Sequence, residues 1–139
     1  MDPEAAHIVL SQATCPIHIL TWEACLLENY NVTNDWRFNG PLADIHSDIL
    51  DLITKPEKKL TDAYGSETWA PADAILMASF LFPEDMILKE EQHRAYVELS
   101  GMYTRGQVAV ERVDLDLPKN VHFIVKVNET AFQSHILDA

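Results

Sequence analysis

Carboxylates are the side chains of this sequence with the clearest capacity for chemistry, and Asp73 is the strongest candidate among them. It falls in the first turn of a predicted helix that begins at Pro71. A carboxylate placed there could ligate a hard cation such as calcium, which takes oxygen ligands. On local sequence alone a simpler interpretation is preferred, because the positive end of a helix dipole stabilises any acidic residue in its first turn.

A second acidic group lies on a predicted helix over residues 41–54, where Asp44, Asp48 and Asp51 fall on the outer face. A metal or acid–base cluster is one interpretation of this row. A solvated helix face is the preferred one, since His46, which lies between the aspartates, has no ligand partner three or four residues further along.

The other chemically active residue types show no recognisable site pattern. The six histidines are scattered without zinc spacing: His7, His18, His46, His93, His122 and His135. Cys15 and Cys25 do not form a CxxC pair and are interpreted as reduced core thiols. Only four glycines are present, and none forms a phosphate-binding loop. These patterns do not indicate a zinc site, a catalytic thiol or a site for nucleotide phosphates.

The elements that would position these residues are mostly helices in the first part of the chain and strands after Pro83. Helices are predicted over 2–13, 21–30, 41–54, 71–82 and 130–137, and strands over 17–20, 86–88, 96–99, 108–110 and 121–127. Residues 29–40 and 55–69 are predicted to be loops, the latter because it contains Pro56 and Gly65. This order indicates an α/β chain that begins like the second half of a larger fold.

Composition narrows the class of protein. The chain has 139 residues, of which 47% are hydrophobic and 23% charged, and its net charge is −12. Such a chain forms a compact core, and its acidic balance argues against binding nucleic acid or an anionic membrane. No apolar run is long enough to span a membrane, and the acidic start lacks a signal-peptide core. We therefore expect a cytoplasmic protein.

Several segments together resemble the inosine-uridine-preferring nucleoside hydrolase family. The segments are Asp2-Pro3-Glu4-Ala5-Ala6, Trp69-Ala70-Pro71-Ala72-Asp73-Ala74, the hairpin Val97–Gln107 with its Thr104-Arg105-Gly106 turn, and Asn120-Val121. Their order and spacing resemble the C-terminal part of that family's subunit. The resemblance implies that residues 1–139 form a single partial domain: the C-terminal portion of an open, Rossmann-like α/β fold, with helices, a small antiparallel strand region and a terminal helix.

The resemblance also implies an activity and its residues. Family members hydrolyse the N-glycosidic bond of ribonucleosides to ribose and free base, using a water molecule activated by a calcium ion. Asp73 matches the family's late calcium ligand, and Tyr64 lies where members place mobile residues over the base. Ala72 stands where many members have a histidine that protonates the leaving base. The N-terminal Asp-rich calcium motif is absent from this sequence. We therefore expect this chain alone to be inactive and not to bind calcium tightly.

The implied partners are a ribonucleoside in the intact family and another protein chain. Members of the family form oligomers, so we expect a homo-oligomer or association with a full-length relative. A non-catalytic interaction module derived from the same fold is the alternative function, and a partial gene model is a third explanation of the short chain. Arg105 could bind an anion or hold backbone carbonyls in place, and we favour the second role.

Overall fold

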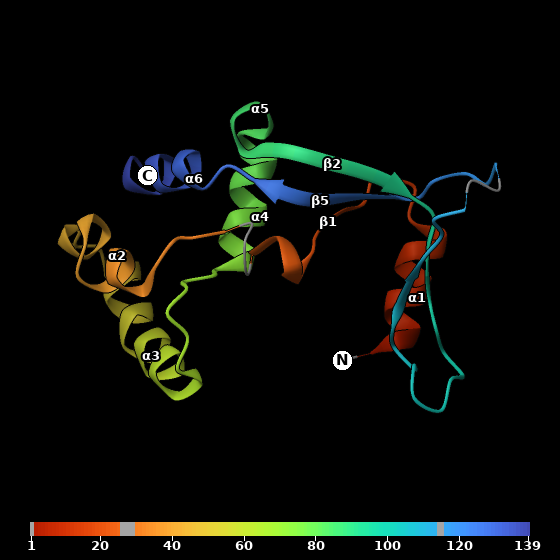
Figure 1. Ribbon diagram of the computed structural model, residues 1–139, viewed down its shortest axis with the longest axis horizontal. Helices are drawn as coiled ribbons and strands as arrows, with labels where there is room; N and C mark the ends of the chain where they lie inside the picture. The colour runs from red at the N-terminus through yellow and green to blue at the C-terminus, as the bar shows by residue number, and fades with distance from the viewer. Residues whose placement is uncertain (1, 26–29, 114–115) are drawn as a thin grey trace. The chain divides into compact units, whose positions relative to one another are not determined.

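The computed structural model describes residues 2–25, 30–113 and 116–139 (Figure 1). The chain divides into two compact units, Met1–Thr21 with Lys89–Val125 and Trp22–Leu88 with Lys126–Ala139. Each unit is described by itself. The expectation of one partial domain stays a prediction.

The first unit places a helix against short strands. Its elements are α1 (Pro3–Gln12), β1 (His18–Leu20), β3 (Ala95–Val97) and β4 (Val108–Val110), with most of β2 (Ile87–His93) and β5 (Val121–Val127). The Asp2 side chain caps α1 by accepting a hydrogen bond from the Ala5 N–H at 3.0 Å, as the Asp-Pro start predicts. Leu10 is the residue of α1 that is buried, and it joins the core of this unit.

The strands form two sheets. One has the order β1-β5-β2, with β1 parallel to β5, and the other is the antiparallel pair β3-β4. β5 is the middle strand, which explains why Phe123 and Ile124 are both buried although they point to opposite faces. The core comprises Leu10, Ala95, Val97, Val121 and Phe123. These observations confirm the predicted α/β class, with a small strand region between helices.

The second unit is built from helices. They are η1 (Trp22–Cys25), α2 (Asn34–Phe38), η3 (Pro41–Asp44), α3 (Asp48–Tyr64), α4 (Ala72–Leu81), α5 (Pro83–Met86) and α6 (Glu129–Leu137). Where a helix is predicted over 21–30, the structure has the 3-10 helix η1, which ends at Cys25. Residues 26–29 of that prediction lie outside the described residues. The predicted loop over 29–40 contains α2, because the Thr33 hydroxyl caps it by accepting from the Trp36 N–H at 3.1 Å.

The helix predicted over 41–54 and the loop predicted over 55–69 have the wrong boundary. Helix is confirmed over 48–54 and irregular chain over 65–69, but residues 45–47 are not helical and residues 55–64 are. The chain turns at residues 45–47, where the Ser47 hydroxyl accepts from the Leu50 N–H at 3.2 Å and starts α3. α3 then continues through Pro56 to Tyr64 and ends at Gly65, which adopts a left-handed conformation with φ 63°. A proline inside a helix costs roughly 3 kcal/mol. Glu57, the next residue, makes tertiary bonds to Arg37 and Trp69 that hold this part of the helix, as described below.

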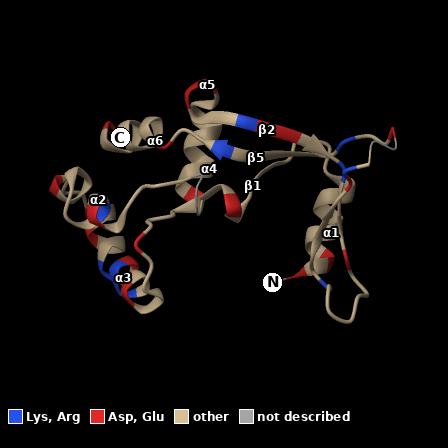
Figure 2. Ribbon diagram, viewed as in Figure 1, with Lys and Arg blue, Asp and Glu red and all other residues tan. Residues whose placement is uncertain are grey.

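The Asp44, Asp48 and Asp51 row is not one helix face. Asp44 belongs to η3, and Asp48 and Asp51 lie in the first turn of α3, where the helix dipole favours acidic side chains. Figure 2 shows acidic residues on this helix and both signs of charge on β2, where Lys89 Nζ lies 2.6 Å from Glu91 Oε1. No helix in the part of the chain that the structure describes is long and apolar enough to cross a bilayer.

Candidate functional site

A pocket of about 390 Å³ opens in the second unit between α3 and the segment that leads into α4. Its lining residues are Trp22, Glu57, Leu60, Thr61, Tyr64, Ser66, Thr68, Trp69, Ala70 and Pro71. Aromatic and aliphatic side chains dominate this wall, and one carboxylate is present. Such a surface suits a flat, largely apolar group with a few polar atoms.

The segment that forms one side of the pocket is held by backbone pairing. Thr68 forms an isolated β-bridge with Thr33, the Trp69 N–H donates to the Val32 carbonyl at 2.8 Å, and the Asn34 N–H donates to the Glu67 carbonyl at 2.9 Å. These bonds fix the direction in which the chain enters α4. They explain why a stretch predicted to be an irregular loop has one defined path.

Trp69 forms the buried floor of the site. Its side chain is 6% exposed, and its ring lies 5.8 Å from Trp36 and 5.9 Å from Phe132, measured between ring centroids. The indole Nε1–H donates to Glu57 Oε1 at 2.6 Å. A buried indole N–H needs such a partner, so this bond sets the orientation of the ring.

Glu57 links the floor to a buried cation. Its Oε2 accepts from Arg37 Nε at 3.0 Å and lies 2.9 Å from Arg37 Nη2, while the guanidinium also donates to the Thr54 hydroxyl at 2.9 Å. Arg37 is 2% exposed and lies 5.6 Å from the ring centroid of Trp69. Both carboxylate oxygens of Glu57 are thus engaged as acceptors, and its role is to fix the pocket wall.

The two residues singled out from the sequence lie at this site in different ways. Tyr64 lines the pocket and is 79% exposed, at the last turn of α3. Asp73 is exposed in the first turn of α4, two residues after Pro71 of the pocket wall. Among the described residues, no hydrogen bond or ion pair holds the Asp73 carboxylate. The structure therefore places the two near one segment, and their roles stay predictions.

The surroundings of Asp73 do not form a calcium site by themselves. Calcium takes six to eight oxygen ligands, several of them anionic. Within the described residues, the one group of three or more possible metal-binding side chains lies elsewhere, and the pocket's Glu57 is occupied by Arg37 and Trp69. One exposed carboxylate cannot supply the set, so the described residues around Asp73 do not complete a calcium site.

Sequence reasoning singled out Tyr64 but missed Arg37 and Glu57, which fix the pocket wall. Arg37 and Glu57 were in segments predicted to be loops, where a charge is ordinarily solvated. The available signal was the amphipathic spacing of Ile53, Leu60 and Tyr64 around Pro56, which continues the helical pattern beyond Thr54.

The proposed backbone clamp at Arg105 is also wrong. Arg105 Nη2 donates to Glu4 Oε1 at 2.6 Å in an exposed pair. The Glu98 carboxylate is the group that organises this hairpin, since its Oε1 accepts from the backbone N–H groups of Ser100 and Gly101 at 2.7 and 3.0 Å. These two bonds to the charged form lower the pKa of Glu98.

The cysteines differ in environment. Cys25 is fully buried, as expected of a core thiol, and burial raises its pKa to about 11. Cys15 is exposed, so the core interpretation is wrong for that residue. Burial also raises the pKa of the Tyr30 hydroxyl well above its ordinary value. None of the three is a candidate nucleophile, because Cys25 and Tyr30 are held in their neutral forms and Cys15 has no activating partner among the described residues.

Comparison with known proteins identifies the family. The sequence model of the inosine-uridine preferring nucleoside hydrolase family matches residues 1–134 of this chain. Among solved structures, the chain is similar to an inosine-guanosine nucleoside hydrolase, with a TM-score of 0.78 and 26% sequence identity over 99% of this chain. It spans 43% of the length of that protein. A search of curated proteins gave no match. The family match covers nearly the whole sequence, and this chain therefore belongs to the inosine-uridine preferring nucleoside hydrolase family.

Proposed function

We propose that this chain carries the late part of a nucleosidase active site, in which a purine or pyrimidine ribonucleoside is hydrolysed at its N-glycosidic bond to ribose and free base. Family membership supports the reaction class. The pocket between α3 and α4 supports the substrate class, since a nucleobase is a flat group that packs against aromatic side chains.

One observation carries the proposal: the pocket wall runs directly into the turn that holds Asp73. Pro71 lines the pocket, and Asp73 follows two residues later. If the nucleobase packs against Tyr64 and Trp69, the attached ribose would lie toward the start of α4. Asp73 is therefore the proposed calcium ligand, and Tyr64 the proposed contact to the base.

Residue 72 constrains how the base departs. Ala72 has a methyl side chain and cannot donate a proton. Glu57 is not a substitute acid, because both of its oxygens accept hydrogen bonds from Arg37 and Trp69. We therefore propose that a group other than residues 57 and 72 donates the proton to the leaving base.

The chain by itself is proposed to be inactive and to bind calcium weakly, because Asp73 belongs to no group of three or more possible metal ligands among the described residues. Calcium titration by calorimetry and an assay of inosine and uridine hydrolysis on the same sample test this. No turnover and no micromolar calcium binding are expected. Turnover that depends on calcium would overturn the proposal of inactivity.

Base binding can be measured without catalysis. Trp22 and Trp69 line the pocket, so hypoxanthine or uracil bound there should change the tryptophan fluorescence. Tyr64→Ala should weaken this binding by about two- to thirteenfold, corresponding to the roughly 0.5–1.5 kcal/mol of an aromatic pair. Tyr103→Ala is the matched control, since Tyr103 is 93% exposed and lies outside the pocket. Equal affinities for the two variants would contradict the role of Tyr64.

A second function, association with another chain, is favoured by the apolar face of α3. All residues of this helix are described, and none of its side chains is buried. Ile49, Leu52 and Leu60 are 72%, 75% and 57% exposed, at spacings that place them on one side. Exposed apolar surface of this kind promotes association.

We propose that this face pairs with a second copy of the chain or with a full-length relative. Sedimentation velocity of the purified chain tests the first case. Dimers are expected, and Leu52→Lys should shift them to monomers, whereas the control Val113→Lys, at an exposed position outside α3, should not. A monomer at all concentrations, with or without an added relative, would argue against association through α3.

A further inference from the structure

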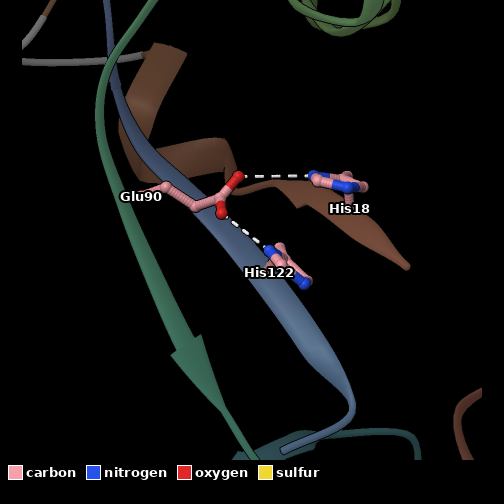
Figure 3. A group of neighbouring side chains, drawn as sticks. All are labelled: His18, Glu90 and His122. Atoms are coloured by element: carbon pink, nitrogen blue, oxygen red, sulfur yellow. Dashed lines mark hydrogen bonds and ion pairs between the residues drawn. The ribbon is translucent and has the colours of Figure 1, made fainter. Parts of the chain in front are cut away.

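Three side chains of types that can bind a metal ion come from separate parts of the sequence and meet on the three-stranded sheet of the first unit (Figure 3). His18 lies on β1, His122 on β5 and Glu90 on β2. His18 and His122 are direct partners in the parallel register of β1 and β5, and β2 is the neighbour of β5 on its other side. Strand pairing, which sequence spacing does not show, therefore creates the group.

The three side chains face one another at short distances. Glu90 Oε1 lies 2.7 Å from His122 Nδ1, and Glu90 Oε2 lies 3.3 Å from His18 Nδ1. The two imidazole rings are stacked with centroids 4.6 Å apart and planes inclined by 29°. When one ligand atom is taken from each residue, the three atoms all lie within 4.8 Å of one another. Figure 3 shows both rings turned toward the carboxylate.

We propose that His18, Glu90 and His122 bind one divalent transition-metal ion, with Zn²⁺ as the best-suited ion. Two imidazole nitrogens and one carboxylate oxygen form a ligand set that zinc takes at about 2.0–2.2 Å, with water in the fourth position. The nitrogen ligands select against calcium and magnesium, which take oxygen. The site is therefore of a different kind from the calcium site proposed at Asp73, and it does not depend on that proposal.

The present contacts are compatible with entry of an ion. The side chains of His18, Glu90 and His122 are 42%, 25% and 29% exposed, so the group is open to solvent on one side while its backbone is fixed in a sheet. Both imidazoles direct Nδ1 at one carboxylate, and a cation between them would replace the hydrogen bond from His122 and the ion-pair contact of His18 with coordination bonds. Gln92 Nε2 lies 3.3 Å from His122 Nδ1, and this contact must break for that nitrogen to ligate.

Calorimetric titration of the 139-residue chain with Zn²⁺, in a buffer that does not chelate the metal, tests the proposal. Saturable binding of one ion per chain is expected. His18→Asn, Glu90→Gln and His122→Asn should each lower the affinity by at least about tenfold, since even the partners of a metal ligand contribute tenfold or more. Glu91→Gln is the carboxylate control, and His46→Asn, at an exposed position in the second unit, is the imidazole control.

A second measurement separates loss of the site from loss of the fold. Circular dichroism establishes that each variant is folded, and His18→Asn, at the most exposed of the three positions, remains informative if His122→Asn does not fold. Co²⁺ in a four-coordinate protein site absorbs visible light far more strongly than hydrated Co²⁺, and this intense band should appear in the unchanged chain and disappear in His18→Asn. Absence of saturable Zn²⁺ binding, or equal affinity in His18→Asn and His46→Asn, would overturn the proposal.

Discussion

The ion pair beneath the pocket gives the sharpest test of how the second unit is held together. Replacement Glu57→Gln keeps the shape of the side chain and removes its charge. The amide has one acceptor oxygen, whereas the carboxylate serves Arg37 on one side and Trp69 on the other. In either orientation an NH₂ group faces an N–H donor.

The structure sets the size of the effect. Arg37 is 2% exposed, so the variant leaves a buried guanidinium without its anionic partner. Removing one member of a fully buried pair costs about 3–5 kcal/mol. The Glu57 side chain is 24% exposed, and water can reach it, so a loss of about 2–3 kcal/mol in the free energy of unfolding is expected.

Urea unfolding followed by tryptophan fluorescence measures this loss, because the Trp69 ring packs in tilted contact with Trp36 and Phe132 in the folded chain. The matched control is Asp62→Asn, an exposed carboxylate on the same helix, which should change stability by less than about 0.5 kcal/mol. In a background that carries Arg37→Met, the cost of Glu57→Gln should shrink, since no buried charge is left unpaired. A cost of Glu57→Gln equal to that of Asp62→Asn would refute this account of the pocket wall.

Three further predictions follow from the environments of single residues. A thiol reagent should label Cys15 in the native chain and label Cys25 only after unfolding, as peptide mapping of the labelled protein would show, because Cys25 is fully buried with a pKa raised to about 11. The Cys25 thiol should not affect the free energy of unfolding below pH 9. As the pH rises from about 9 toward 11, that free energy should fall, because the thiol ionises in the unfolded chain before it ionises in the folded chain. Urea titrations across this pH range should show a smaller fall for Cys25→Ser. Asn120→Ala should cost about 2–3 kcal/mol by the same urea assay, because the Asn120 amide donates to the carbonyls of Leu10 and Ala95 and accepts from the Ala95 N–H; a cost below about 0.5 kcal/mol would show that water replaces these bonds.

The sequence by itself determined the family, the α/β class and the elements whose signals are local. β4 and β5 have the predicted bounds, and the capping of α1 by Asp2 follows from side chains within one turn of each other. The terminal helix begins one residue before its predicted start. These features depend on alternation, caps and apolar spacing, which act between neighbours along the chain.

Tertiary structure alone decided the two side-chain clusters, Arg37–Glu57–Trp69 and His18–Glu90–His122, and it supports the continuation of α3 through Pro56. A proline inside a predicted loop gave no reason to continue a helix, and the reason lies in the bonds that Glu57 makes to Arg37 and Trp69, twenty and twelve residues away. His18 and His122 come together only because β1 and β5 pair in register. Such contacts form only when elements distant in the sequence pack together, and a short stretch of sequence does not specify that packing.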